Sequence, residues 1–133
     1  LGLTTWSPLA YGVLTGKYST GTPEGSRMES PLFKAISPDF AERVAQADKL
    51  KPVAEELGIS LAELALAWCM SNENVSTVLI GAKTVPQLEQ NLKALGAVEL
   101  ITSDVKAKID ALVPFVPQLP KPDVIAMVRA KHL

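Results

Sequence analysis

The chain has little of what several protein classes require. Cys69 is its only cysteine and His132 its only histidine, so an internal disulfide and a zinc site are both excluded. A single cysteine agrees with a reducing compartment, and we expect a cytoplasmic protein. The formal net charge of −1 lacks the basic excess that nucleic-acid surfaces usually need, so no nucleic-acid partner is expected. No apolar run approaches the roughly 20 residues of a membrane span, and no membrane insertion is expected.

The composition is that of a globular protein, with 47% apolar and 20% charged residues. A length of 133 residues fits one domain or part of a larger one. The chain begins at Leu1 rather than Met, and its first residues already favour a core strand. We therefore expect a piece of a longer protein whose N-terminal part is absent.

The segment 78–91 organises the rest of the chain. Ser76–Ile80 predicts a strand buried on both faces, and Gly81 allows a sharp turn and a close approach to a ligand. Thr84 and Gln87 fit a capping box, and the N-terminus of the helix they start would favour an anion, with Lys83 adding positive charge. Taken alone, these residues are explained more simply by an ordinary, well-capped strand–helix unit.

The first third of the chain predicts one strand and little helix. Residues 1–6 favour a strand that Ser7 and Pro8 end. Residues 12–17 can form one helical turn at most, because a glycine lies at each side. Residues 19–37 predict a long loop, which is either functional or a surface excursion.

The remainder predicts helices. Pro52 should divide the first of them, Gly58 should end it, and the second should begin with a capping box at Ser60 and be apolar almost all round. The expected helices are 37–57, 60–72, 84–96 and 102–113, and a final helix could span 123–131 in a tail containing Pro114, Pro117, Pro120 and Pro122.

Two strands separated by helices predict part of an α/β barrel or a doubly wound sheet, because two strands alone make no stable sheet. In a barrel, functional residues gather at the carboxyl ends of the strands. The turns 6–9 and 81–84 both lie at such ends and should share one face.

The run Thr5-Trp6-Ser7-Pro8-Leu9-Ala10, followed by Leu14–Tyr18, resembles the seventh strand and following loop of aldo-keto reductases. It is most similar to the branch that contains the β subunits of voltage-gated potassium channels, as are residues 59–68 and 81–92. The resemblance implies that residues 1–113 are the C-terminal portion of a (β/α)8 TIM barrel, namely strands 7 and 8 with their helices. Residues 114–133 would form a C-terminal tail.

The resemblance also implies an NADP(H) site. Its residues would be Trp6 beneath the nicotinamide ring; Ser7, Pro8, Leu9, Gly12, Lys17 and Arg27 around the pyrophosphate; Gly81, Lys83 and Gln87 at the 2′-phosphate; and Gln90 and Asn91 at the adenine.

Some of these residues have other readings. Trp6 could be a core tryptophan, and Arg27 a solvated loop arginine. Gln87 and Gln90 differ from the arginine and the acid that many family members carry there, although Lys83 can supply the missing positive charge.

No catalytic residue can be assigned, because the family's aspartate, tyrosine, lysine and histidine come from earlier strands. Tyr11 and Tyr18 follow the cofactor loop instead. The resemblance implies NADPH-dependent reduction of a small aldehyde or ketone by the complete protein, a possible homo-oligomer, and no activity of this chain alone. Two alternatives remain open: an NADP-binding regulatory module like the channel β subunits, and a fragment without function.

Overall fold

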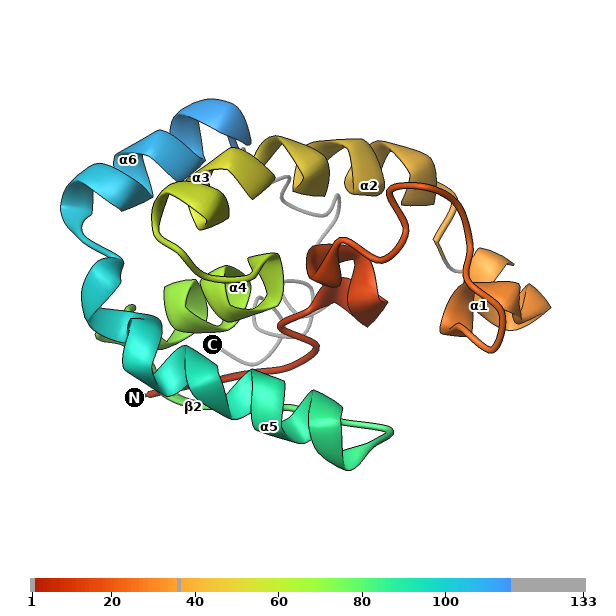
Figure 1. The fold of residues 1–133 in the computed structure, drawn as a ribbon, viewed down its shortest axis with the longest axis horizontal. Coiled ribbons are helices and arrows are strands. Elements are labelled where there is room, and N and C mark those ends of the chain that lie inside the picture. Colours follow the sequence, from red (N-terminus) through yellow and green to blue (C-terminus); the bar gives the residue numbers. More distant parts are fainter. Residues whose placement is uncertain (1, 36, 116–133) are drawn as a thin grey trace, which may run out of the picture.

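The computed structural model describes residues 2–35 and 37–115. They form a helix-rich unit around one pair of strands (Figure 1). The elements are β1 (Leu3–Thr5), the 3₁₀ segments η1 (Ala10–Thr15) and η2 (Arg27–Glu29), α1 (Pro31–Ala35), α2 (Phe40–Lys49), α3 (Lys51–Glu56), α4 (Leu61–Met70), β2 (Val75–Val78), α5 (Val85–Lys93), η3 (Ala94–Leu100) and α6 (Ser103–Leu112).

The two strands pair in parallel, as alternation of strands and helices predicts. Thr5 lies opposite Val78, and the Leu79 backbone N–H continues the ladder by donating to the Thr5 carbonyl at 3.0 Å. Because the strands are parallel and in register at this end, the turns that follow Thr5 and Val78 leave from the same edge. The prediction that both turns share one face is confirmed.

Helix α4 lies at the centre of the unit, with α2 and α3 on one side and α5 and β2 on the other (Figure 1). Its start is the predicted capping box. The Ser60 Oγ accepts the Glu63 N–H at 3.2 Å, and Glu63 Oε2 accepts the Ser60 N–H at 2.9 Å. Leu64 and Leu66 are among the largest fully buried side chains, and burial of each contributes roughly 1.5–3 kcal/mol. Trp68 lies on this helix, which is predicted to be apolar almost all round, and is 44% exposed.

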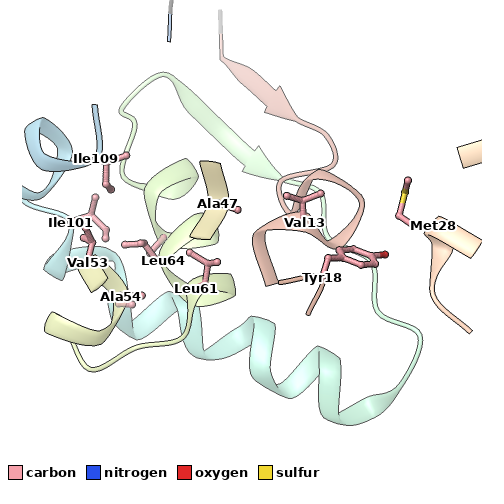
Figure 2. Packing of buried hydrophobic residues seen from close by; sticks show 12 residues of the cluster. Val13, Tyr18, Met28, Ala47, Val53, Ala54, Leu61, Leu64, Ile101 and Ile109 are labelled. Carbon is pink, nitrogen blue, oxygen red and sulfur yellow. The ribbon is translucent and has the colours of Figure 1, made fainter. Parts of the chain in front are cut away.

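The core joins the helices to the first loop (Figure 2). The cluster gathers Val53 from α3, Leu64 from α4, Ile101 from the end of η3 and Ile109 from α6, while Val13 and Tyr18 reach it from the segment after β1. That loop is therefore held by apolar packing, although it contains little regular structure.

Several helix boundaries follow the predicted signals. The helix predicted over 37–57 is divided into α2 and α3 at Leu50, just before Pro52, and Gly58 ends it with a φ of 69°. Thr102 caps α6 by accepting the Val105 N–H at 3.3 Å.

Other boundaries differ from prediction. The Ser37 carbonyl, rather than a side-chain cap, accepts the Phe40 N–H, and α2 starts three residues after Ser37. The expected loop 19–37 contains two short helical segments, η2 and α1. The prediction of at most one turn over 12–17 is confirmed, because η1 begins earlier, at Ala10, and a kink at Tyr11 and Gly12 leaves a single turn in that range. Gly96 does not end the helix after Thr84, which tightens into η3 and continues to Leu100.

The sheet consists of β1 and β2 alone in the described part of the chain. The prediction that Ser76–Ile80 forms a strand buried on both faces is wrong for this chain, since β2 ends at Val78 and Leu79 is 50% exposed. The physical reason is that no further strand pairs with β1 or β2 within the described residues. A stripe of exposed apolar residues with helical spacing continues along α5 into η3, namely Val85, Leu88, Leu92 and Leu95.

In the described ranges, every helix is too short or too polar to cross a bilayer. Most of the tail predicted over 114–133, including the possible helix 123–131 and His132, lies outside the described residues.

Candidate functional site

The two turns that leave the carboxyl ends of β1 and β2 form the candidate site. We call the residues 6–12 and 81–84 the strand-end site. The first turn carries no acidic residue, and neither does the chain from there to Lys17. The stretch 79–88 also lacks an acid and contains one charged residue, Lys83. The donor set of the site is therefore suited to an anion rather than to a metal or a cationic ligand.

The first turn is built from strained backbone. Ser7, Ala10 and Tyr11 have φ values of 54°, 47° and 58°, and Gly12 follows with 95°. Left-handed conformations of residues other than glycine cost on the order of 1–3 kcal/mol each, and they concentrate at ligand-binding sites. Backbone hydrogen bonds hold the turn, as the Ser7 carbonyl accepts the Ala10 N–H and the Leu9 carbonyl accepts the Gly12 N–H. Pro8 and Leu9 are half-buried between these bonds.

Trp6 projects from this turn and is 73% exposed. It is not a core tryptophan in this chain, so that alternative is wrong here. The Tyr11 ring meets the Trp6 ring edge-on, with centroids 5.9 Å apart. A large aromatic face is thus presented at the strand end, as stacking on a flat ring would require.

The two cations of the first region differ in placement. Lys17 folds back over Gly12, and its ammonium stands 4.9 Å from the centroid of the buried Tyr18 ring. Arg27 is exposed in η2, where its guanidinium lies 5.9 Å from the Phe33 ring. Lys17 is therefore held against the strained turn, whereas Arg27 contacts α1.

The second turn is a capped helix start. The Thr84 Oγ1 accepts the Gln87 N–H at 3.4 Å, as predicted. The reciprocal bond differs from a capping box, because Gln87 Oε1 accepts the N–H of Lys83, at 2.8 Å, instead of that of Thr84. The Gln87 side chain is consequently fixed across the mouth of the turn, next to the exposed Lys83 side chain. Within the described residues, no carboxylate pairs with the Lys83 ammonium.

Gly81 does not adopt the left-handed conformation, and a Cβ there would meet no atom within 4 Å. The sharp turn that Gly81 is expected to allow therefore makes no use of a left-handed glycine conformation. The space in front of Gly81 is open, so a ligand could approach the backbone closely there.

The two α5 residues that are predicted to hold the adenine, Gln90 and Asn91, differ in burial. Gln90 is exposed, but Asn91 is only 9% exposed and is the one buried residue of α5. Since the two positions are adjacent, they point in directions about 100° apart around the helix. Only Gln90 is freely accessible from the open side of this chain.

Two depressions in the described part are lined by residues other than the predicted ones. One, about 280 Å³, lies behind η1 between Gly16, Lys51, Glu55 and Ser60. A smaller one of about 110 Å³ lies between Trp68, Asn72, Lys106 and Asp110. The strand-end site is thus an open surface in this chain, on which β1 and β2 place the two turns at one edge.

Sequence reasoning missed a polar network behind the first turn. The Ser19 Oγ donates to Asp48 Oδ1 at 2.6 Å and accepts from Lys51 Nζ at 2.6 Å, while Lys51 also pairs with Asp48 at 2.8 Å. The hydrogen bonds from Lys51 and Ser19 lower the pKa of Asp48. The network ties the chain after Lys17 to α2 and α3, and separations of 29 and 32 residues left no local signal for it.

The described residues give little support to a cysteine nucleophile or to a metal site. Burial raises the pKa of the Cys69 thiol, so this residue is a poor nucleophile at neutral pH. No three His, Cys, Asp or Glu side chains gather for a metal in ranges 2–35 and 37–115.

Comparison with known proteins places the chain in a family. The sequence model described as "Aldo/keto reductase family" matches residues 1–114. A protein of Oryza sativa subsp. japonica named "Probable voltage-gated potassium channel subunit beta" is 48% identical over 121 residues, which cover 89% of this chain and 37% of that protein. A protein of Arabidopsis thaliana with the same name is 44% identical over 127 residues, covering 91% of this chain and 38% of that protein. The chain thus spans little more than a third of these relatives, and the resemblance to the channel β-subunit branch is confirmed.

Proposed function

The chain belongs to the aldo/keto reductase family, and on this premise we propose that it supplies the cofactor-binding part of an NADPH-dependent carbonyl reductase. The family implies a (β/α)8 barrel, and we assign β1 and β2 to its strands 7 and 8. In that barrel, further strands and helices would cover Leu79, Ile80 and the exposed stripe on α5. The open surface at the strand ends would then become one wall of a cleft.

The observation that carries the proposal is the register of β1 and β2. Thr5 lies opposite Val78, so the Trp6 turn and the Lys83 turn leave the same edge of the pair. One turn presents an exposed aromatic ring and a lysine, and the other presents a lysine beside a capped helix start. A dinucleotide needs this combination of a flat apolar face at one end and positive charge at the phosphates.

Each predicted residue would contact a different part of the cofactor. Trp6 would stack on the nicotinamide ring, and the strained backbone from Ser7 to Gly12 would follow the pyrophosphate with Lys17 as its counter-charge. Lys83 and Gln87 would hold the 2′-phosphate in the open space before Gly81, with Gln90 nearest the adenine. Arg27 and Asn91 are weaker members of the set, because the first contacts Phe33 and the second is buried.

NADPH supplies the hydride when bound, and the role of this chain is to bind and orient it. The residues that protonate the carbonyl oxygen would come from other barrel strands. We therefore expect a small aldehyde or ketone as substrate of the complete protein, and no turnover by the 133-residue chain alone.

The proposal is tested by titrating the full-length protein with NADPH and following protein fluorescence. Trp6→Ala should weaken binding, whereas Trp68→Phe, at a half-exposed position away from the strand ends, should leave it unchanged. Consumption of NADPH with generic aldehydes then tests the reaction. An unchanged dissociation constant for Trp6→Ala would remove this residue from the site, and absence of turnover with tight binding would argue against the reductase.

The names of the relatives favour a second function, that of a potassium-channel β-subunit-like regulatory module with NADP as a redox ligand. The two functions separate in one pair of measurements on the full-length protein, namely turnover with aldehydes and retention by cytoplasmic segments of a channel. Tight cofactor binding and channel retention without turnover would favour the module.

A further inference from the structure

We infer that Tyr11 is a positioning residue that sets the orientation of the Trp6 ring. The inference rests on the proposed cofactor site, because it concerns how Trp6 is presented to the nicotinamide ring. It assigns a role to a residue that none of the cofactor contacts proposed above includes.

The first observation is a continuous chain of aromatic contacts. Trp6 meets Tyr11 at 5.9 Å between centroids with an interplanar angle of 80°, and Tyr11 meets Phe33 of α1 at 5.6 Å and 61°. Phe33 is half-buried and packs against the hydrophobic core. Trp6, although 73% exposed, is thereby connected to the core through the Tyr11 ring. Among the described residues, Tyr11 is the one aromatic ring that contacts Trp6.

The second observation is the backbone of Tyr11. Its φ of 58° and ψ of 22° lie in the left-handed region, which an aromatic residue rarely adopts. Gly12, the next residue, also has a positive φ, which a glycine adopts at no steric cost. A glycine at position 11 could form the same kink, so the kink alone does not require a tyrosine. What the tyrosine adds is the ring between Trp6 and Phe33. An unfavourable backbone position is thus occupied by a large side chain whose contacts run toward the site.

The chemistry of the contact explains its effect on Trp6. Edge-on pairs place the positive edge of one ring against the negative face of another, so they favour a limited range of ring orientations. A tryptophan held in this way has less rotational freedom to lose when a flat ligand ring stacks on it. The contacts of Tyr11 with Trp6 and Phe33 are made by its ring, so the ring carries the role.

The experiment uses the full-length protein with Trp68 and every tryptophan outside this chain replaced by Phe, so that Trp6 is the tryptophan that reports. Three variants are compared: Tyr11→Phe, which keeps the ring; Tyr11→Gly, which removes the ring but relieves the backbone; and Phe33→Leu, which removes the second contact. Trp6 fluorescence anisotropy is measured without cofactor, and the NADPH dissociation constant is measured on the same samples.

Tyr11→Phe should match the parent in both measurements. Tyr11→Gly should lower the anisotropy and raise the NADPH dissociation constant about twofold to tenfold, the range expected for one aromatic pair. Phe33→Leu should change both in the same direction by less. Because glycine is favoured at this φ, a purely structural role for Tyr11 predicts that Tyr11→Gly matches or exceeds the parent in thermal stability, anisotropy and affinity.

The inference is overturned if Tyr11→Gly leaves either the anisotropy or the NADPH affinity unchanged. Trp6→Ala in parallel separates this failure from that of the proposed function. If Trp6→Ala weakens NADPH binding while Tyr11→Gly does not, the cofactor site stands and the positioning role falls. If Trp6→Ala has no effect on binding, both fall together.

Discussion

The side chain of Lys17 lies over Gly12, with Cε 2.8 Å from the point that a β-carbon on Gly12 would occupy. The ammonium is 3.0 Å from the same point and stands over the Tyr18 ring. A glycine at this position therefore leaves room for the cation that the site would place at a pyrophosphate. Its φ of 95° adds a backbone reason for the same residue.

Gly12→Ala should separate these two roles. The backbone term costs about 1–2 kcal/mol in the free energy of unfolding, as for any L-residue in the left-handed region. The added methyl group also displaces the end of Lys17, which is flexible, so this step should cost little stability but lower NADPH affinity. Gly25→Ala is the matched control, since Gly25 has a φ of 71° and open space around it. Urea denaturation should give similar losses for both variants, while NADPH titration should give a loss for Gly12→Ala alone. Equal NADPH affinities of the Gly12→Ala and Gly25→Ala variants would mean that the position of Lys17 is irrelevant to binding.

Ser60→Ala should destabilise the protein by about 1 kcal/mol, because it removes the cap of the central helix α4. The Glu63 N–H loses its acceptor, and the reciprocal bond from Ser60 to Glu63 loses its geometry. Thr102→Ala removes a single capping bond on the peripheral α6 and should cost less. Ser103→Ala, at an exposed position with no side-chain hydrogen bond in the described structure, serves as the neutral control. The midpoint of urea denaturation should be lowest for Ser60→Ala, intermediate for Thr102→Ala and highest for Ser103→Ala. A Ser60→Ala midpoint equal to that of Ser103→Ala would contradict the role of the cap.

Asp48 should contribute stability that depends on pH. The hydrogen bonds from Lys51 and Ser19 lower the pKa of its carboxyl, so the ionised form is favoured in the folded protein. A lowered folded pKa gives stability that is present above the unfolded value, near pH 4, and is lost as pH falls through the folded pKa. Asp48→Asn should therefore lower the free energy of unfolding at pH 7, and the difference from the parent should close below about pH 4.

Asp39→Asn is the control for that series. Asp39 pairs with Arg43 at 2.7 Å on the surface of one helix, and the Arg43 hydrogen bond lowers its pKa in the same direction. Because this pair joins no separate elements and is open to solvent, its loss should change stability less. Denaturation curves from pH 2 to 7 would distinguish the two, and a constant gap for Asp48→Asn at every pH would exclude a role for its charge.

The features that could be predicted from the sequence are local ones. The Ser60–Glu63 capping box, the division of a helix before Pro52 and the Thr84 cap each depend on residues within four positions of one another. The parallel pairing of β1 and β2 followed from the helices between them, and with it the meeting of the two turns.

What could not be predicted depends on contacts between distant residues. Tyr11 adopts a left-handed conformation that its residue type disfavours, and its ring is held between Trp6 and Phe33. The Ser19 network joins residues 29 and 32 positions apart. Asn91 is buried because of the way α5 packs, which the pattern of a single helix does not specify. Leu79 is exposed because burial on both faces requires neighbouring strands, and the described residues supply none beyond β1 and β2.

Lys83→Ala tests the positive charge at the second turn. Its side chain is exposed beside the N-terminus of α5, and Gln87 is fixed to its backbone N–H. If this turn holds the 2′-phosphate, the lysine is the charge that separates NADPH from NADH. A charge-assisted contact contributes about 1.5–3 kcal/mol, which is about tenfold to a hundredfold in affinity. Lys83→Ala should therefore weaken NADPH binding by that factor and leave NADH binding nearly unchanged.

Salt and a neighbouring variant sharpen the test. High salt should erode the NADPH preference of the parent but not of Lys83→Ala, because screening acts on the charge that the variant lacks. Thr84→Ala loses a helix cap and about 1 kcal/mol of stability, and it should affect both cofactors alike. Paired fluorescence titrations of the full-length protein with NADPH and NADH measure all three effects. If Lys83→Ala weakens both cofactors equally, or neither, Lys83 is a solvated turn residue and the 2′-phosphate is bound elsewhere.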